Sequence, residues 1–140
     1  YMSVNDFIKI QKMPAEKDYK IAEQGNGFVI PGEDFLASIS PDEPIRYIAL
    51  LRYTQGEKRA NHYHEKKVEH LIALDGEIKV ELYPIEDKDD VLQVRIKGGD
   101  MLTIQPGCNH TLTALTETAT ILELSPQKLD LSDQRSPGLA

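Results

Sequence analysis

Three of the four histidines in this chain lie in one short stretch, ANHYHEKKVEHLIALDG, at residues 60–76. His62 and His64 are two residues apart, so on an extended strand both imidazoles project from the same face. Glu69 follows in the same stretch, and His110 lies further on in PGCNH. Neutral imidazole and carboxylate groups together suit divalent Fe, Mn, Zn, Ni or Cu. Whether they form one site depends on the elements that carry them.

The elements expected after residue 45 are β-strands. Short runs rich in β-branched and aliphatic residues recur there, each bounded by Gly, Pro or Asp, and such spacing predicts an all-β sandwich or barrel. The runs are IRYIALLRY, VEHLIAL, EIKVELY, VLQVRIK, DMLTIQ, HTLTAL and TATILEL. Residues 25–39 are expected to add one or two edge strands. The polar tail at 127–140 is expected to be flexible.

The dipeptide Asp75-Gly76 between two of these runs predicts a tight β-hairpin. The expected register pairs Ala73 with Ile78, Leu71 with Val80 and Glu69 with Leu82. Because side chains alternate between the two faces of a strand, one face becomes apolar and faces the core. That face carries Leu71, Ala73, Ile78, Val80 and Leu82, and it also carries Glu69. His70 is expected on the opposite face, with Ile72 and Leu74.

An inward-facing glutamate requires a partner, because an ionised carboxylate on an apolar face is costly unless it is paired or bound to a cation. His110 alternates in phase with Leu112 and Ala114, so it is also expected to face inward. Three histidines and one glutamate can therefore converge inside the barrel. Two other interpretations stay open here: a lone His-x-His pair often binds nothing, and Glu69 could pair with a buried Arg or Lys.

These residues resemble the two sequence motifs of the cupin superfamily. The stretch GEKRANHYHEKKVEHLIALDG is similar to the first motif, and Gly56, His62, His64, Glu69 and Gly76 fill its positions. The stretch GDMLTIQPGCNH resembles the second motif, which Gly99, Gly107 and His110 match. The chain departs from the pattern where Gln105 replaces a usual proline and Ala114 a usual asparagine; neither position ligates metal in the family.

The resemblance implies an all-β fold: a double-stranded β-helix or jelly-roll (cupin) barrel, RmlC-like, with short N-terminal strands. It implies a single cupin domain over 1–140, with a barrel core at about 40–126. It also implies that one divalent transition metal (Fe, Mn, Zn or Ni) is bound by His62, His64, Glu69 and His110. Small cupins of this kind commonly form homodimers, and the outer-face Ile72 and Leu74 would suit such an interface.

Composition narrows the range of partners. The chain has 140 residues and a net charge of −7, from 16 basic and 23 acidic residues, which argues against a nucleic-acid surface. It has no apolar run long enough to span a bilayer, and we expect no secretory signal. The single cysteine, Cys108, can form no internal disulfide and is expected to be a small buried residue. A cytoplasmic protein without membrane contact is expected.

Three functions remain open, because the cupin fold carries many chemistries. The favoured one is a metal-dependent oxygenase, isomerase or lyase acting on a small polar molecule, whose catalytic residues are unknown. The alternative is a sugar or nucleotide-sugar isomerase or epimerase, because KRANHYH is similar to the first motif of barrels from polysaccharide biosynthesis. There a histidine can act as a base without metal, and Arg59 or Lys58 could contact a phosphate. The third is a non-catalytic module that binds a small ligand.

The cavity of such a barrel is expected to have a mostly apolar wall with a few polar groups. The wall residues expected from the strand alternation are Leu71, Ala73, Leu102, Ile104, Leu112 and Ala114. Tyr47, Arg52 and Tyr53 are expected near its mouth. The acidic run at 85–90 lacks the glycine and ligand spacing of an EF-hand, so it is expected to be a solvated hairpin tip.

Overall fold

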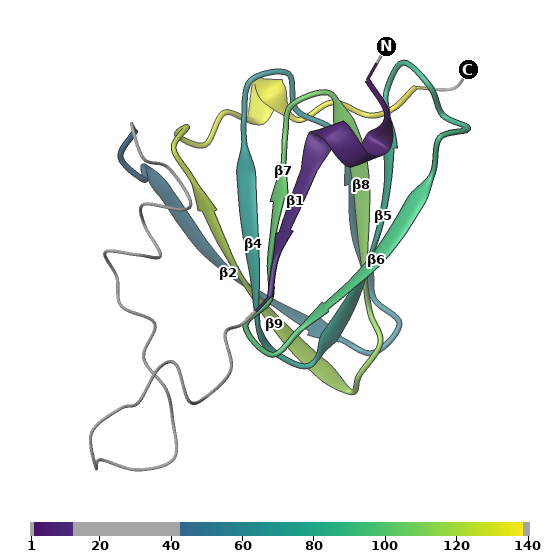
Figure 1. Ribbon diagram of the computed structural model, residues 1–140. Coiled ribbons are helices and arrows are strands. Elements are labelled where there is room, and N and C mark those ends of the chain that lie inside the picture. Colours follow the sequence, from purple (N-terminus) through teal and green to yellow (C-terminus); the bar gives the residue numbers. More distant parts are fainter. Residues whose placement is uncertain (1, 13–42, 139–140) are drawn as a thin grey trace.

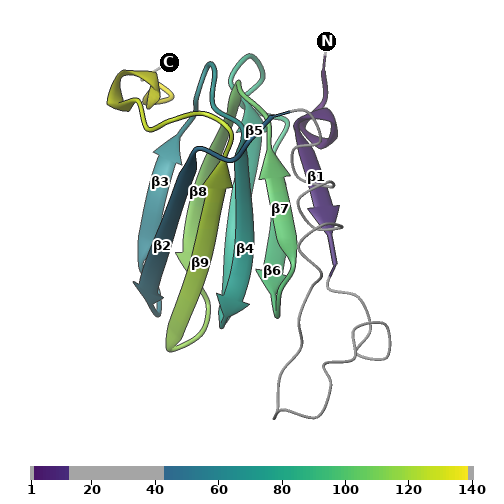
Figure 2. The ribbon, with the colours of Figure 1, turned by 90° about the vertical axis from the view of Figure 1, so that its left-hand side faces the viewer.

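The computed structural model describes residues 2–12 and 43–138, and these form two antiparallel sheets that face each other (Figures 1 and 2). One sheet has five strands in the order β1-β7-β4-β9-β2, and the other has four in the order β3-β8-β5-β6. The strands are β1 (Ile8–Gln11), β2 (Tyr47–Thr54), β3 (Lys58–His62), β4 (Glu69–Asp75), β5 (Glu77–Pro84), β6 (Leu92–Lys97), β7 (Met101–Ile104), β8 (Cys108–Ala114) and β9 (Thr118–Ser125). Two 3-10 turns, η1 (Val4–Phe7) and η3 (Leu131–Asp133), flank them.

The order of the strands confirms the jelly-roll prediction. From β2 to β9 the chain passes from one sheet to the other at almost every connection, and only β5 and β6 are consecutive neighbours in one sheet. Each run predicted after residue 45 forms a strand. At the N-terminus, β1 pairs with β7 and adds the outer strand of the larger sheet. The edge strands expected at 25–39 lie outside the described residues.

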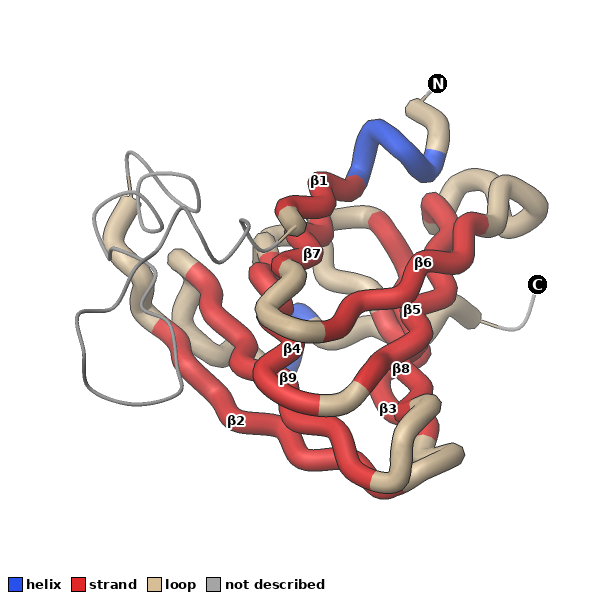
Figure 3. Tube along the Cα trace, turned by 60° about the horizontal axis from the view of Figure 1, so that its bottom comes forward, coloured by secondary structure: helices blue, strands red, loops and turns tan. Residues whose placement is uncertain are grey.

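The core lies between the inner faces of the two sheets (Figure 3). The alternation in β5 is complete: Ile78, Val80 and Leu82 are fully buried, while the residues between them are half-buried. Leu71 and Ala73 of β4 meet them from the other sheet. Burial of a Val, Leu or Ile side chain contributes about 1.5–3 kcal/mol, so this layer holds the sheets together around the site.

The predicted hairpin at Asp75-Gly76 is wrong. β4 pairs with β7 and β9, whereas β5 pairs with β6 and β8, so the turn carries the chain across to the opposite sheet. The faces were nevertheless assigned correctly, because inward-facing residues of both sheets contact the same core. The Ala73–Ile78 and Glu69–Leu82 strand pairs do not exist; Ala73 pairs with Ile121, and Glu69 pairs with Ile104.

Gly76 is required at this crossing. Its φ is +73°, and a Cβ added there would meet the carbonyl oxygen of Thr118 and the Oγ1 of Thr116. Gly98 also has a positive φ, +55°, but has open space around it. We expect Gly98→Ala to lower the free energy of unfolding by about 1–2 kcal/mol, the cost of a left-handed non-glycine residue. Gly76→Ala should cost clearly more, measured by urea denaturation; equal losses would contradict the steric argument.

The outer face of the five-stranded sheet is apolar. Ile72 packs there with Met101 and Leu124, whereas Leu74 is 49% exposed. On the edge strand β2, Ile48 and Leu50 are 66% and 68% exposed. The homodimer expected from the sequence stays a prediction. None of the described helical segments is long and apolar enough to cross a bilayer.

Candidate functional site: a histidine and glutamate cluster in the barrel

The two histidines of the His-x-His pair reach the site through an irregular piece of backbone. β3 ends at His62, and its pairing with β8 shifts register between Ala60 and His62. Ala60 and Asn61 have φ angles of 72° and 57°, in the left-handed region. The prediction that both imidazoles project from one regular strand is therefore wrong. His64 lies beyond the strand, in the loop that leads to β4.

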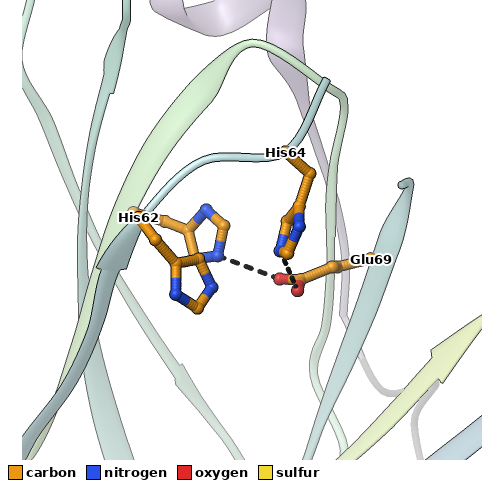
Figure 4. Close-up of side chains that lie close together, drawn as sticks. His62, His64 and Glu69 are labelled. Carbon is orange, nitrogen blue, oxygen red and sulfur yellow. Dashed lines mark hydrogen bonds and ion pairs between the residues drawn. The ribbon is translucent and has the colours of Figure 1, made fainter. Parts of the chain in front are cut away.

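The structure nevertheless brings all four predicted residues together. One ligand atom from each of His62, His64, Glu69 and His110 lies within 4.8 Å of the others. His64 Nε2 is 2.8 Å from Glu69 Oε1, and His110 Nε2 is 3.0 Å from Glu69 Oε2. Figure 4 shows the carboxylate of Glu69 between two of the rings, with His62 beside them. As metal ligands these four residues stay a prediction.

Backbone carbonyl groups fix the orientation of two rings. The Nδ1 of His64 is 3.2 Å from the carbonyl oxygen of Asp133, and the Nδ1 of His110 is 3.1 Å from that of Cys108. A carbonyl only accepts, so each Nδ1 is the protonated nitrogen. In a neutral ring Nε2 then carries a lone pair, and the Nε2 atoms of His64 and His110 lie 2.8 and 3.0 Å from the Glu69 carboxylate oxygens. That arrangement is repulsive unless protons or another cation lie between them.

The charges of this cluster stabilise one another. Burial opposes ionisation of Glu69, but the charge of His110 and the hydrogen bond and charge of His64 outweigh it and hold its pKa well below the usual value. Burial likewise opposes protonation of His110, but Glu69 raises its pKa overall. At 3.0 Å the His110–Glu69 contact is close enough for an ion pair. It is not aligned as a hydrogen bond, so Nε2 remains a buried atom without a hydrogen-bond partner among the described residues.

His62 has a different character. Its side chain is half-buried and lines the cavity. Burial, followed by the neighbouring charge of His110, lowers the pKa of His62 from 6.5 to about 4. The ring is therefore neutral at pH 7, and its lone pair is available to accept a proton or to bind a cation.

The cavity in front of the cluster has a volume of about 230 Å³. Leu51 and Leu71 of one sheet and Leu112 of the other contribute apolar surface to it, and most of the other lining residues are polar. Its lining residues are Tyr47, Leu51, Tyr53, Arg59, Ala60, His62, Lys67, Glu69, Leu71, His110, Leu112, Glu123 and Gln134. His64 is absent from this lining and is only 3% exposed, so it supports the cluster from behind.

A buried lysine lies next to the histidine cluster. Lys67 Nζ is 2.8 Å from Glu123 Oε1, 3.6 Å from Glu69 Oε1 and 4.3 Å from the centre of the Tyr47 ring. Burial favours the neutral amine, but the hydrogen bond and charge of Glu123 outweigh it and raise the pKa of Lys67. Burial and the nearby Glu69 charge raise the pKa of Glu123. The cavity therefore contains a fixed ammonium group beside a neutral imidazole.

The residues predicted for the wall and mouth of the cavity lie partly in its lining and partly elsewhere. Leu71, Leu112, Tyr47 and Tyr53 line the cavity, while Ala73, Leu102, Ile104 and Ala114 belong to the core behind it. Arg52 is not at the mouth, because it alternates with the inward Tyr53 and is exposed. His70 is buried on the outer face, where its Nδ1 is 2.8 Å from Thr103 Oγ1.

Sequence reasoning missed three groups of the site, and for one of them a signal was present. Glu123 is two residues after the inward Ile121 in β9, so strand alternation places it on an inner face. Lys67 lies in the loop before β4, where that alternation does not apply. Gln134 lines the cavity from the C-terminal segment. No local pattern in that polar stretch indicates it.

Cys108 is close to His110 in sequence, but its thiol is buried. Its side chain is 1% exposed, and burial raises the pKa of its thiol to about 12. The reactive thiolate is thus essentially absent at pH 8. We expect Ellman's reagent to label native Cys108 at least about a hundredfold more slowly than the urea-unfolded chain. Rapid stoichiometric labelling of the native protein would contradict this.

Similar folds occur among solved structures. A variant of the 3,4-ketoisomerase QdtA from Thermoanaerobacterium thermosaccharolyticum, in complex with TDP-4-keto-6-deoxyglucose, matches with a TM-score of 0.67 and 22% identity, covering 91% of this chain and 85% of that one. QdtA in complex with TDP matches with a TM-score of 0.59 and 23% identity, covering 64% of this chain and 65% of that one. The 3,5-epimerase RmlC from Legionella pneumophila Philadelphia 1 matches with a TM-score of 0.67 and 15% identity, covering 92% of this chain and 77% of that one. At these identities the matches establish the cupin fold.

The lengths of the matched proteins differ. The chain covers 65% of the QdtA–TDP chain but only 25% of the capsular polysaccharide assembling protein CapF from Staphylococcus aureus, which matches with a TM-score of 0.60 and 16% identity. Among curated proteins, no sequence matches this one. The family described as FdtA: WxcM-like, C-terminal, matches residues 8–136, nearly the whole chain. This cupin-fold chain therefore belongs to the FdtA, WxcM-like C-terminal family.

Proposed function

We propose that this protein transfers a proton next to the ketone of a nucleotide-linked keto sugar, as a ketoisomerase or epimerase does. The observation that carries the proposal is the cavity in which neutral His62 lies near the ammonium group of Lys67. Both side chains line the same cavity, and the charge of Lys67 is one of the causes that lower the pKa of His62. Membership of the FdtA family and the likeness to QdtA and RmlC support the same chemistry. The metal-dependent reading has less support.

The cavity offers the two groups that this reaction needs. A base removes the hydrogen on the carbon beside the ketone, the C–H electrons form the C=C of an enediolate, and the ketone oxygen becomes negative. Neutral His62 is the base, and Lys67 stabilises the developing negative oxygen. A proton returned to the same carbon from the other face inverts it. A proton delivered to the former carbonyl carbon moves the ketone: the neighbouring hydroxyl loses its proton to form the new C=O, and the former ketone oxygen gains a proton to become a hydroxyl. Neither outcome requires an oxidant.

The mouth of the cavity suits a phosphorylated substrate. Arg59 lines it, and its side chain is 43% exposed. Its Nε is 2.7 Å from Glu57 Oε1, and its guanidinium lies 4.6 Å from the centre of the Tyr53 ring. A held guanidinium at the rim can contact a diphosphate. The sugar would then extend inward, towards His62.

The test uses TDP-4-keto-6-deoxyglucose, the compound bound by the QdtA variant. The protein is incubated with it in D₂O, and proton NMR follows exchange at the carbons beside the ketone. We expect exchange far above the buffer rate. Exchange at C3 alone fits ketoisomerase chemistry, whereas exchange at C3 and C5 fits a 3,5-epimerase. A thermal shift with the nucleotide sugar but no exchange would favour the non-catalytic binding module. If the nucleotide sugar produces no thermal shift and no exchange, the proposal is wrong.

A second candidate is a metal-dependent enzyme, and the two Nε2 atoms packed against the Glu69 carboxylate favour it. A divalent transition metal would be held by His62, His64, Glu69 and His110, a donor set that suits Fe, Mn, Zn or Ni. The carbonyl groups that fix the two Nδ1 atoms are the outer partners usual for metal-bound histidines. The unpartnered Nε2 of His110 fits the same group. When bound, such an ion would polarise a substrate oxygen.

Metal content decides this candidate. Protein made without a polyhistidine tag would contain close to one equivalent of a transition metal, and His64→Ala would lose most of it, because His64 is one of four ligands. The matched control is His70→Ala, which removes the one histidine on the outer face. If elemental analysis finds less than about a tenth of an equivalent of any transition metal in the parent protein, that result counts heavily against a metal site, since structural and catalytic sites are normally filled.

A further inference from the structure

The loop from Tyr63 to Val68, which carries His64 and Lys67, has no strand partner in the barrel for its N–H groups. Five of these N–H groups instead donate to the C-terminal segment 127–135. The N–H groups of Tyr63 and Val68 donate to the Arg135 carbonyl at 3.0 Å and to Gln127 Oε1 at 2.8 Å. Those between them, Glu65, Lys66 and Lys67, donate to one carboxylate, that of Asp133.

Asp133 is the centre of this contact. Its Oδ1 accepts the N–H of Glu65 at 3.0 Å, and its Oδ2 accepts those of Lys66 and Lys67 at 3.3 and 3.1 Å. The residue is 7% exposed. A buried carboxylate that accepts several backbone N–H groups is firmly held, because charge-assisted hydrogen bonds are stronger than neutral ones. It fixes the conformation of three consecutive residues of the loop.

The same residue also orients the imidazole of His64. The carbonyl oxygen of Asp133 accepts from His64 Nδ1 at 3.2 Å, and its carboxylate Oδ2 is 3.9 Å from the same nitrogen. With Nδ1 held in this way, Nε2 faces Glu69 at 2.8 Å. The next residue, Gln134, lines the cavity itself. Loop backbone, ring orientation and cavity wall therefore depend on one short C-terminal segment.

We propose that Asp133 is a positioning residue of the site: its carboxylate binds the loop, which places Lys67 and holds the Asp133 carbonyl against His64 Nδ1, so that the tautomer of His64 is fixed. The proposal rests on the proposed function for its effect on turnover, but not for its effect on His64. On this reading the C-terminal segment 127–135 is part of the functional unit. The sequence predicts only that this tail is flexible, and that statement about motion stays a prediction.

The experiment compares Asp133→Ala and Asp133→Asn with the control Asp130→Ala. Asp130 caps the same turn, η3, but it is exposed, and its carboxylate accepts from the Ser132 N–H and hydroxyl, whereas that of Asp133 accepts from the loop N–H groups. Long-range ¹H–¹⁵N NMR reads the tautomer of His64, and the D₂O exchange assay reads kcat and KM. We expect Asp133→Ala to mix the two tautomers and to lower kcat about 10–100-fold, as loss of an outer partner does. KM should change less than kcat. Asp133→Asn retains an acceptor oxygen and should be intermediate, and Asp130→Ala should match the parent.

Each outcome has one meaning. If Asp133→Ala lowers Tm but leaves the His64 tautomer and kcat as in Asp130→Ala, the segment is merely structural and the proposal is wrong. If Asp133→Ala does not fold, Asp133→Asn decides by the same two readouts. If the parent protein shows no exchange with the nucleotide sugar, the proposed function fails. The NMR comparison of His64 still tests the positioning role in that case, because it needs no substrate.

Discussion

His62→Asn is expected to lower the rate of deuterium exchange into TDP-4-keto-6-deoxyglucose by about 10²–10⁴-fold, the usual contribution of a general base. Asparagine retains much of the shape of histidine and can form hydrogen bonds, but its amide does not accept a proton at neutral pH. His62 is the half-buried histidine of the cavity wall, whereas His64 lies behind it and His110 is fully engaged with Glu69. Its replacement therefore removes the base without removing the ion pairs of the cluster.

The matched control is His70→Asn. His70 is the neighbour of Glu69 in sequence, but its side chain lies on the outer face of the five-stranded sheet, where it is bonded to Thr103. We expect its exchange rate to stay within about threefold of the parent when measured well below Tm, because distant substitutions act on stability and not on the reacting groups. If His62→Asn retains the parent rate, His62 is not the base. If the exchange rate falls equally in the two variants, the cause is a general loss of native structure and not the removal of a base.

The inward direction of Glu69 could be predicted from the sequence although its strand partner could not. Side chains alternate along a strand whatever the neighbour is, so the phase set by Leu71 and Ala73 places Glu69 on the core side. The Asp75-Gly76 turn suggested a hairpin, because that dipeptide tolerates positive φ in any tight connection. Whether such a turn returns to the same sheet or crosses to the opposite one depends on long-range packing. The sequence of the turn does not contain that information.

Two further parts of the site depend on tertiary structure in the same way. The convergence of His62 and His64 requires the left-handed backbone at Ala60 and Asn61, which β-strand periodicity does not indicate. Asp133 lies in a polar stretch with no apolar period, and its burial becomes visible only when the loop at 63–68 is placed against it. By contrast, Glu123 follows the ordinary alternation of β9, in phase with Ile121. Lys67 precedes β4 and takes its position from the loop.

Removal of the Glu69 carboxylate is expected to have the largest effect on stability. Glu69→Ala leaves His110, His64 and Lys67 buried without the negative charge that they share. Loss of one partner from a buried charge pair typically costs about 3–5 kcal/mol of unfolding free energy, and urea denaturation would measure it. The control is Glu81→Gln, which breaks the partly exposed 3.2 Å pair with Lys79. That pair should contribute less than about 1 kcal/mol. Comparable losses in the two variants would contradict the account of the cluster.

Glu69→Gln separates the two ways in which the cluster can be stabilised. A glutamine amide can donate a hydrogen bond to one of the two Nε2 lone pairs, so this variant needs less positive charge and should lose less stability than Glu69→Ala. If protons on the imidazoles stabilise the parent protein, EDTA leaves its urea midpoint unchanged. If a divalent metal is bound by the four residues, EDTA lowers the parent midpoint, because a ligand of the native state adds to its stability. The midpoint of Glu69→Gln, which has lost a ligand, should then respond much less to EDTA.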